Sequence, residues 1–256
     1  MNPKFIRNAS AMLLMLFAGS AAFAAVEKPV QYKSGDENVS AVMYMPDDAA
    51  KSGKKYPAII VIHEWWGLND WVKEQAKKFA DQGYVTLAVD LYRGRMATTP
   101  DEAHELMRGL PRDRAVKDMR AGFAWLTRQK FVSTKKIGAI GWCMGGGMAE
   151  ALAEDEPQLA AVVINYGSVP SEDASVKKIH APVLGLFGGK DRGIPPESAQ
   201  KFEATMKKMG RDVEVHIYPN SGHGFQNPNN KGGYQAEDAA DAWKRITEFF
   251  AAKLKK

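Results

Sequence analysis

Short apolar runs alternate along the chain with longer segments that are apolar on one side only. Residues 56–63 are almost wholly apolar, as strands buried on both faces of a sheet are. Residues 115–129 instead place apolar side chains at helical spacing from Val116 to Leu126, which predicts a helix packed on a sheet. The expected strands cover 30–32, 39–45, 56–63, 84–90, 137–140, 159–166, 182–187 and 213–218. The expected helices cover 70–82, 115–129, 195–209 and 236–254, and a further helix starts within 148–152.

This order of elements predicts the α/β class. The first two strands, joined by the turn-rich Ser34-Gly35-Asp36, form an antiparallel pair. The later strands alternate with helices, which predicts a mostly parallel central sheet with helices on both faces. In such sheets ligands bind at the carboxyl ends of the strands. The chemically capable residues expected at those ends are Glu64, Arg93, Cys143, Asp191 and His223.

Composition limits the classes of protein that fit. With 256 residues, 45% apolar and 25% charged, the chain can bury a full core. No linker or repeat divides it, so we expect a single domain over residues 25–256. The net charge of +5 is modest and the lysines are scattered, so we expect a solvated surface rather than a nucleic-acid partner.

The first 24 residues have the pattern of a cleavable secretory signal. Lys4 and Arg7 precede an apolar stretch over residues 11–17, and Ala22-Phe23-Ala24 follows as a small-x-small cleavage site. The apolar stretch is too short to span a membrane. We therefore expect cleavage near Ala24 and a periplasmic or secreted protein without a membrane anchor.

The stretch Gly141-Trp142-Cys143-Met144-Gly145-Gly146 lies between an expected strand and an expected helix. A sharp strand-to-helix turn of the form G-x-nucleophile-x-G is the nucleophile elbow of the α/β-hydrolases. It would expose the Cys143 sulfur and aim the Met144 amide at a developing oxyanion. A lone cysteine is more often a small buried apolar residue. An unpaired thiol in an oxidising compartment, however, favours a function.

Asp191 and His223 complete a candidate triad with Cys143. Nucleophile, acid and histidine follow one another in the chain order of α/β-hydrolases. His223 would take the thiol proton and later deliver it to the leaving oxygen, while Asp191 orients the imidazole. Cys143 would attack a carbonyl carbon and form a thioester.

The chain resembles the dienelactone hydrolases (carboxymethylenebutenolidases) over nearly all of its mature length. The segments that carry the resemblance are His63-Glu64-Trp65-Trp66-Gly67, Asp90-Leu91-Tyr92, the elbow, Asp191 and Gly222-His223-Gly224-Phe225. The resemblance implies that Glu64 helps to activate the thiol and that the Trp65 amide is the second oxyanion donor beside Met144. It also suggests Tyr92, Trp66 and Phe225 as substrate-binding residues, although the sequence leaves open whether Trp65 and Trp66 form core or pocket wall.

Two features depart from the family pattern. Relatives that bind a dienelactone carboxylate use an arginine after Asp-Leu-Tyr, here Arg93 or Arg95, and another four residues beyond the histidine. The second position holds Asn227. One arm of the carboxylate clamp is therefore missing, which predicts that neutral lactones or aryl esters are hydrolysed at least as well as anionic ones. The secretory signal is the second departure.

The sequence therefore predicts an exported cysteine hydrolase for small-molecule esters or lactones. It should need no metal or cofactor and be a monomer or small homo-oligomer. One alternative is an esterase or peptidase-like hydrolase of broader specificity on the same fold. Another is a non-catalytic binding or thiol-sensing protein.

Overall fold

The computed structural model describes residues 24–170 and 172–256, and the expected signal lies outside this range apart from Ala24. The strands are β1 (Ala25–Ser34), β2 (Glu37–Pro46), β3 (Tyr56–Ile62), β4 (Val85–Val89), β5 (Val132–Trp142), β6 (Ala161–Asn165), β7 (Val183–Gly188) and β8 (Val213–Tyr218). The helices are α1 (Asp70–Ala80), α2 (Pro100–Arg108), α3 (Arg112–Thr127), α4 (Met144–Asp155), α5 (Asp173–Val176), α6 (Pro196–Lys208) and α7 (Ala236–Phe250), followed by a π-helical turn (Ala251–Lys255).

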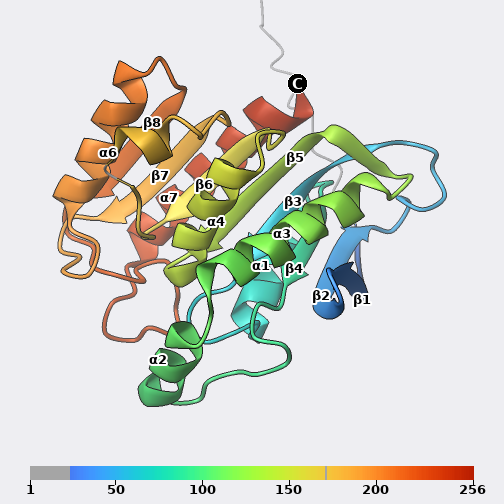
Figure 1. Ribbon diagram of the computed structural model, residues 1–256, viewed down its shortest axis with the longest axis horizontal. Coiled ribbons are helices and arrows are strands. Elements are labelled where there is room, and N and C mark those ends of the chain that lie inside the picture. The colour runs from blue at the N-terminus through green and yellow to red at the C-terminus, as the bar shows by residue number, and fades with distance from the viewer. Residues whose placement is uncertain (1–23, 171) are drawn as a thin grey trace, which may run out of the picture.

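The eight strands form one twisted sheet in the order β1-β2-β4-β3-β5-β6-β7-β8 (Figure 1). β1 and β2 form a long antiparallel hairpin at one edge, and β2 also runs antiparallel to β4. All pairings from β4 through β8 are parallel. The expected α/β fold with a mostly parallel sheet is confirmed.

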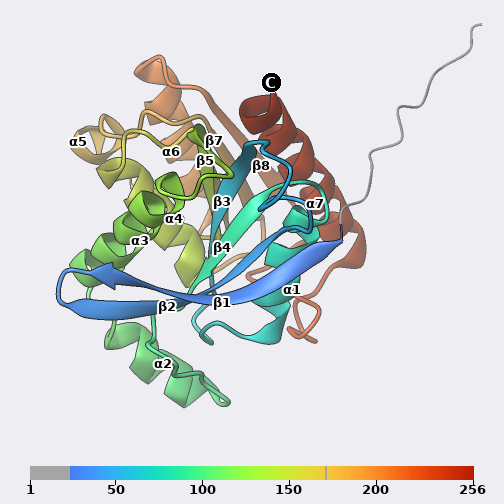
Figure 2. The same cartoon turned by 90° about the vertical axis from the view of Figure 1, so that its right-hand side faces the viewer.

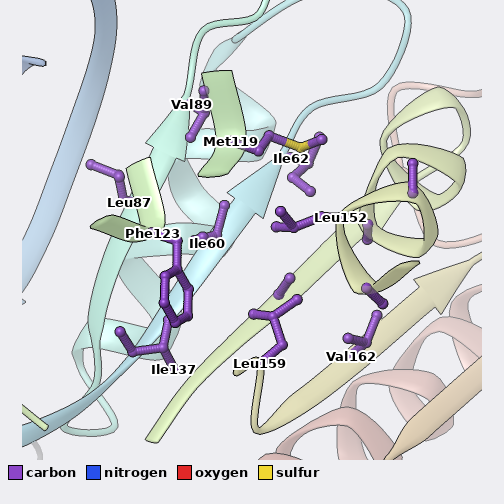
Figure 3. Packing of buried hydrophobic residues seen from close by; sticks show 14 of the residues in the cluster. Ile60, Ile62, Leu87, Val89, Met119, Phe123, Ile137, Leu152, Leu159 and Val162 are labelled. Carbon is purple, nitrogen blue, oxygen red and sulfur yellow. The ribbon is translucent and has the colours of Figure 1, made fainter. Parts of the chain in front are cut away.

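Apolar side chains are buried on both faces of the sheet. On one face, Ile60 and Ile62 of β3 pack with Met119 and Phe123 of α3 and Leu152 of α4 (Figure 3). Ile59 and Val61 point to the other face, where α1 and α7 cover them. Because successive strand residues alternate between faces, a strand buried on both must be apolar throughout, as β3 is.

The chain reverses its direction of travel across the sheet at β3, which pairs with β4 on one side and β5 on the other. α1 and α4, which follow β3 and β5, therefore pack on opposite faces, and the loops at the carboxyl ends of these strands diverge. Ile62 lies beside Gly141, so the two strands end at the same level. Such a reversal opens the crevice in which α/β proteins bind ligands.

Two helices were not expected from the sequence. α5 is a four-residue turn, whereas α2 begins with a complete capping box in which Thr99 and Glu102 satisfy each other's backbone amides. Figures 1 and 2 show α2 apart from the helices that cover the sheet. In the described ranges, no helix is both long and apolar enough to cross a membrane.

Candidate active site

Cys143 lies at the turn between β5 and α4, with φ 56° and ψ −120°. Side chains other than glycine rarely adopt this region, and such strain is typical of functional sites. A Cβ on Gly141 would overlap the Gly145 carbonyl, so the turn requires glycine there. The Cys143 amide donates to the Asn165 carbonyl at 3.0 Å, which ties the strained turn to β6. The side chain is a free thiol of intermediate exposure.

His223 and Asp191 are joined by a hydrogen bond of 2.7 Å between Nδ1 and Oδ2. The other oxygen of Asp191 accepts the Gly193 and Ile194 amides, each at 2.9 Å. Burial works to raise the pKa of Asp191, but the hydrogen bonds from His223 and from the two amides outweigh it and hold the pKa below its ordinary value. Asp191 is therefore a fixed carboxylate.

His223 is in contact with the Cys143 sulfur as well as with Asp191. Burial alone would lower the pKa of His223, but hydrogen bonds to Asp191 and Cys143 raise it to about 10. Because Asp191 occupies Nδ1, Nε2 is the ring nitrogen available to the sulfur. The structure thus brings together the three residues of the expected triad, with the imidazole between carboxylate and thiol.

Glu64 is 4% exposed and lies just beyond β3. Its Oε2 accepts a hydrogen bond from Asn227 Nδ2 at 2.6 Å, and its Oε1 accepts one from the Tyr166 hydroxyl at 3.5 Å. Burial raises the pKa of Glu64 to about 7, against the lowering effect of Asn227, His223 and Tyr166. Glu64 can therefore change its protonation state near neutral pH.

Tyr166 is a site residue that the sequence did not single out. It follows β6 with φ 37°, and its ring meets the His223 ring edge-on at 5.2 Å between centroids. Its position as the last residue of an expected strand was the only available signal, and an apolar run ending in tyrosine also fits an ordinary core strand.

His63 also has a place that the sequence did not predict. The Leu91 amide donates to its Nε2 at 3.2 Å, so Nδ1 carries the proton and donates to the Glu64 carbonyl at 2.6 Å. Burial lowers the pKa of His63, which favours this neutral form. The ring therefore ties the end of β3 to the loop after β4.

A cavity of about 940 Å³ opens above Cys143, His223 and Glu64. Trp65 and Trp66 both line it, which decides that they form pocket wall rather than core. α2 adds His104, whose ring meets that of Trp65 edge-on at 4.8 Å, and Met107. Met144 is the first residue of α4, so its amide has no acceptor within the helix. The cavity is large enough for a drug-sized ligand.

The expected substrate-binding arginines lie elsewhere. Arg93 forms ion pairs with Glu37 at 2.8 Å and Asp118 at 2.9 Å, and Arg95 pairs with Glu105 on the surface at 3.5 Å. Neither is among the described residues that line the cavity. The expectation that one of them faces the pocket was wrong, because acidic partners on β2, α2 and α3 hold both side chains outside it.

Tyr92 and Phe225 lie behind the cavity wall rather than in it. The Tyr92 hydroxyl donates to the Met144 sulfur at 3.1 Å, and Tyr92 is only 4% exposed. Phe225 is fully buried and packs against Tyr166 and Tyr218. Neither is among the described residues that line the cavity, so the expectation that they bind substrate was wrong. Trp66 alone of the expected substrate-binding residues lines the cavity.

Asn227, which stands where the family pattern has an arginine, forms hydrogen bonds of its own in the structure. It is 3% exposed, its Nδ2 donates to Glu64, and its Oδ1 accepts the Asn229 amide at 2.9 Å. The positive charges that do line the cavity belong to Lys190, Arg192 and Lys231, which the sequence did not single out. Within residues 24–170 and 172–256, no group of three His, Cys, Asp or Glu side chains is placed to hold a metal ion.

Known proteins resemble the chain in sequence and in structure. It is 33% identical over 210 residues to a Yersinia pestis protein named "Putative carboxymethylenebutenolidase", covering 76% of this chain and 78% of the relative. A dienelactone hydrolase-like promiscuous phosphotriesterase from metagenomic libraries superposes with a TM-score of 0.81 at 26% identity, over 90% of this chain and 99% of the other. An acylaminoacyl peptidase of Pyrococcus horikoshii shares the fold at 18% identity, with a TM-score of 0.72 over 91% of this chain and 42% of the other.

A family model also matches most of the chain. The model of the dienelactone hydrolase family matches residues 39–254, which run from within β2 past the end of α7 and include every candidate catalytic residue. The relatives named as carboxymethylenebutenolidases agree with it, as do the solved structures that share the fold. The chain therefore belongs to the dienelactone hydrolase family, whose members are carboxylic ester hydrolases of the α/β-hydrolase fold that act on small ester or lactone substrates.

Proposed function

We propose that this chain is an exported cysteine hydrolase that cleaves esters or lactones through a thioester on Cys143. The observation that supports this most is the pairing at the elbow. The Cys143 sulfur lies beside His223, and His223 is held by Asp191 at 2.7 Å above an open cavity. Nucleophile, base and orienting acid within hydrogen-bond reach are the requirement of covalent acyl transfer.

The first half of the reaction forms the thioester. His223 accepts the thiol proton, and the Cys143 thiolate attacks the substrate carbonyl carbon. The negative charge that develops on the carbonyl oxygen is stabilised by the backbone amides of Met144 and Trp65. The tetrahedral adduct then collapses, the bond from carbon to the leaving oxygen breaks, and His223 gives its proton to that oxygen.

The second half releases the acid. A water molecule transfers a proton to His223 and attacks the thioester carbonyl. The carbon–sulfur bond breaks, the sulfur recovers the proton and the acid leaves. Glu64, with its raised pKa and its position in the cavity wall, is the group we assign to assist removal of the thiol proton.

Trapping the acyl group tests the proposal. Cys143→Ala should lose turnover of aryl esters while keeping its fold, and Cys143→Ser should retain a reduced rate because a hydroxyl is less nucleophilic than a thiolate. Intact mass after rapid quenching should show wild-type protein heavier by one acyl group. Turnover by Cys143→Ala near the wild-type rate would rule out this nucleophile. Fast oxidation by peroxide without ester turnover would favour a thiol sensor.

Export rests on the signal pattern of the first 24 residues. Expression of the whole chain in a bacterial host should yield a periplasmic or secreted protein whose N-terminus is Ala25. A variant that lacks residues 2–24 should stay in the cytoplasm and keep the same kcat. Cytoplasmic retention of the uncleaved whole chain would contradict export without affecting the proposed chemistry.

A further inference from the structure

The cavity above Cys143 has two unlike walls. One is apolar and aromatic, formed by Trp65, Trp66, His104 and Met107, and its tryptophan rings meet edge-on at 4.9 Å. The other consists of Lys190, Arg192 and Lys231, which we call the cationic rim. A ligand that fills both sides must present apolar surface to one wall and accept positive charge from the other.

The cationic rim is attached to the base of the triad. Lys190 and Arg192 flank Asp191, which holds His223. Lys231 follows Asn230, whose Nδ2 donates to the carbonyls of His223 at 3.0 Å and Gly224 at 3.3 Å. All three cations therefore belong to the two loops that position the imidazole.

No described carboxylate forms an ion pair with any of the three cations. The two acidic residues of the cavity, Asp191 and Glu64, are engaged elsewhere. Asp191 is bound to His223 and to two backbone amides, and Glu64 is bound to Asn227 and Tyr166. The side chains of Lys190, Arg192 and Lys231 are exposed. The His223 side of the cavity thus presents uncompensated positive charge to an entering ligand.

We propose that the cationic rim binds an anionic group on the alcohol side of the substrate, while the aromatic wall receives an apolar acyl group. This inference rests on the proposed function. Since His223 protonates the leaving oxygen, the leaving group must lie beside His223 and hence beside the rim. The carboxylate clamp expected at position 227 is then unnecessary, and the expected preference for neutral substrates is reversed for esters whose alcohol part is charged.

Two matched pairs of esters test where the charge is recognised. The alcohol-side pair is 3-carboxyphenyl and 3-carbamoylphenyl phenylacetate. The acyl-side pair is phenyl 4-carboxyphenylacetate and phenyl 4-carbamoylphenylacetate. Each pair differs only in charge at one end, and the ratio of kcat/KM for the anionic to the neutral member is the readout.

The test variant is Lys190→Gln/Arg192→Gln/Lys231→Gln. The control is Lys51→Gln/Lys54→Gln/Lys55→Gln, which removes the same charge from exposed positions before β3, at the end of this strand opposite the one that leads to Glu64. Relative to wild type, the alcohol-side ratio should fall about tenfold in the test variant and stay within about twofold in the control. The acyl-side ratio should change less than about twofold in both.

Salt and charge reversal give independent readouts. The wild-type alcohol-side ratio should fall as salt rises from 20 to 500 mM, because exposed charges are screened. Lys231→Glu should lower it further than the neutral change alone. An unchanged alcohol-side ratio in the triple variant, or a fall confined to the acyl-side pair, would overturn the assignment of the rim while leaving the hydrolase intact. Absence of turnover on all four esters by wild type would instead contradict the proposed function itself.

Discussion

At the scale of single residues, two neighbours both stabilise the protonated form of His223. Asp191 holds Nδ1, and the sulfur of Cys143 favours a proton on the ring, so the pKa of His223 rises to about 10 despite burial. These two contacts stabilise the imidazolium that forms when His223 takes the thiol proton.

Removal of either partner should show that these residues act as a unit. We expect His223→Ala to lower kcat by on the order of 10³-fold or more, because no base remains for the thiol. Asp191→Asn should cost less than loss of the nucleophile, and the double variant should lose far less than the product of the single losses. Steady-state kinetics on one aryl ester provide the comparison. Fully multiplicative losses would mean that the two residues work independently.

Ionisation of Glu64 should make the free energy of unfolding depend on pH. Burial raises the pKa of this carboxyl to about 7 from its ordinary value of 4.5, so between these two pH values the folded state holds a proton that the unfolded chain has released. The stabilisation is complete below the unfolded pKa and is lost as pH rises through about 7. The difference in pKa corresponds to roughly 3 kcal/mol across that window.

Glu64→Gln should remove this pH dependence. The carboxamide cannot ionise, and it can still accept from Asn227 and donate to the Tyr166 hydroxyl. Urea unfolding from pH 4.5 to 8 should therefore show the wild type losing stability relative to the variant, by roughly 3 kcal/mol in total. Glu197→Gln, exposed on α6, should keep the wild-type slope. Parallel pH profiles for wild type and Glu64→Gln would refute the assignment.

At the scale of elements, the start of α4 determines where the nucleophile stands. Gly145 packs directly on the backbone at the end of β3, where an added Cβ would come within 2.4 Å of the His63 carbonyl oxygen. Backbone cannot rotate aside as a side chain can. This close approach sets the distance between the Cys143 turn and the loop that carries Glu64 and Trp65.

Gly145→Ala should therefore damage the site as well as the fold. We expect a loss of roughly 1–3 kcal/mol in the free energy of unfolding and a fall in kcat, because α4 must shift away from β3. Gly147→Ala is the matched control in the same helix, since its nearest neighbour is the Ser168 hydroxyl, which can turn away. Equal effects of the two changes on kcat would count against the close packing at Gly145.

Helix α2 was not predicted from the sequence, yet it contributes residues to the cavity. Only Ala103 and Leu106 of its nine residues are buried, so the helix has few core residues from which a sequence pattern could reveal it. Its capping box is a local signal that could have located it, with Thr99, Pro100 and Glu102 in the preferred positions. The helix contributes His104 and Met107 to the cavity, and that contribution depends on where the chain places the helix in space.

At the scale of the whole molecule, the C-terminal turn closes the face of the sheet covered by α1 and α7. Leu254 is fully buried, and with Phe250 it packs so closely on Gly138 of β5 that a Cβ there would lie 3.0–3.2 Å from their side chains. Lys255 Nζ donates to the Gln82 carbonyl at 2.6 Å and lies 4.4 Å from the Tyr84 ring centroid. The end of the chain is thus part of the core.

Leu254→Ala should separate stability from activity. The cavity it leaves should cost about 2–5 kcal/mol and lower Tm by on the order of 5–15 °C. The kcat at 25 °C should stay near that of wild type, because Leu254 packs near the start of the apolar part of β5, far from the strand ends that hold the site. Lys256→Ala is the control and should leave Tm unchanged within about 2 °C. A wild-type Tm for Leu254→Ala would show that this turn adds nothing to the core.

The sequence by itself determined the class of fold and the candidate triad. Apolar runs of strand length report burial on both faces, and the elbow needs glycine at Gly141 because the Gly145 carbonyl of the same turn occupies the space of a Cβ. The order of Cys143, Asp191 and His223 and their places after strands are likewise local properties. Because parallel strands end at a common edge, those places suffice to bring the three together.

Only the tertiary structure decided which side chains meet the substrate. Arg93 and Arg95 follow a strand as Glu64 does, yet both form ion pairs outside the cavity. Arg93 pairs with Glu37 and Asp118, which come from other segments of the chain, and Arg95 pairs with Glu105 of the next helix. Asn227 faces Glu64, 163 residues earlier in the chain, and Lys231 reaches the cavity through a loop held by Asn230. Charge–charge pairing across long separations has no local pattern, so the direction of a charged side chain follows from the fold and not from its neighbours in sequence.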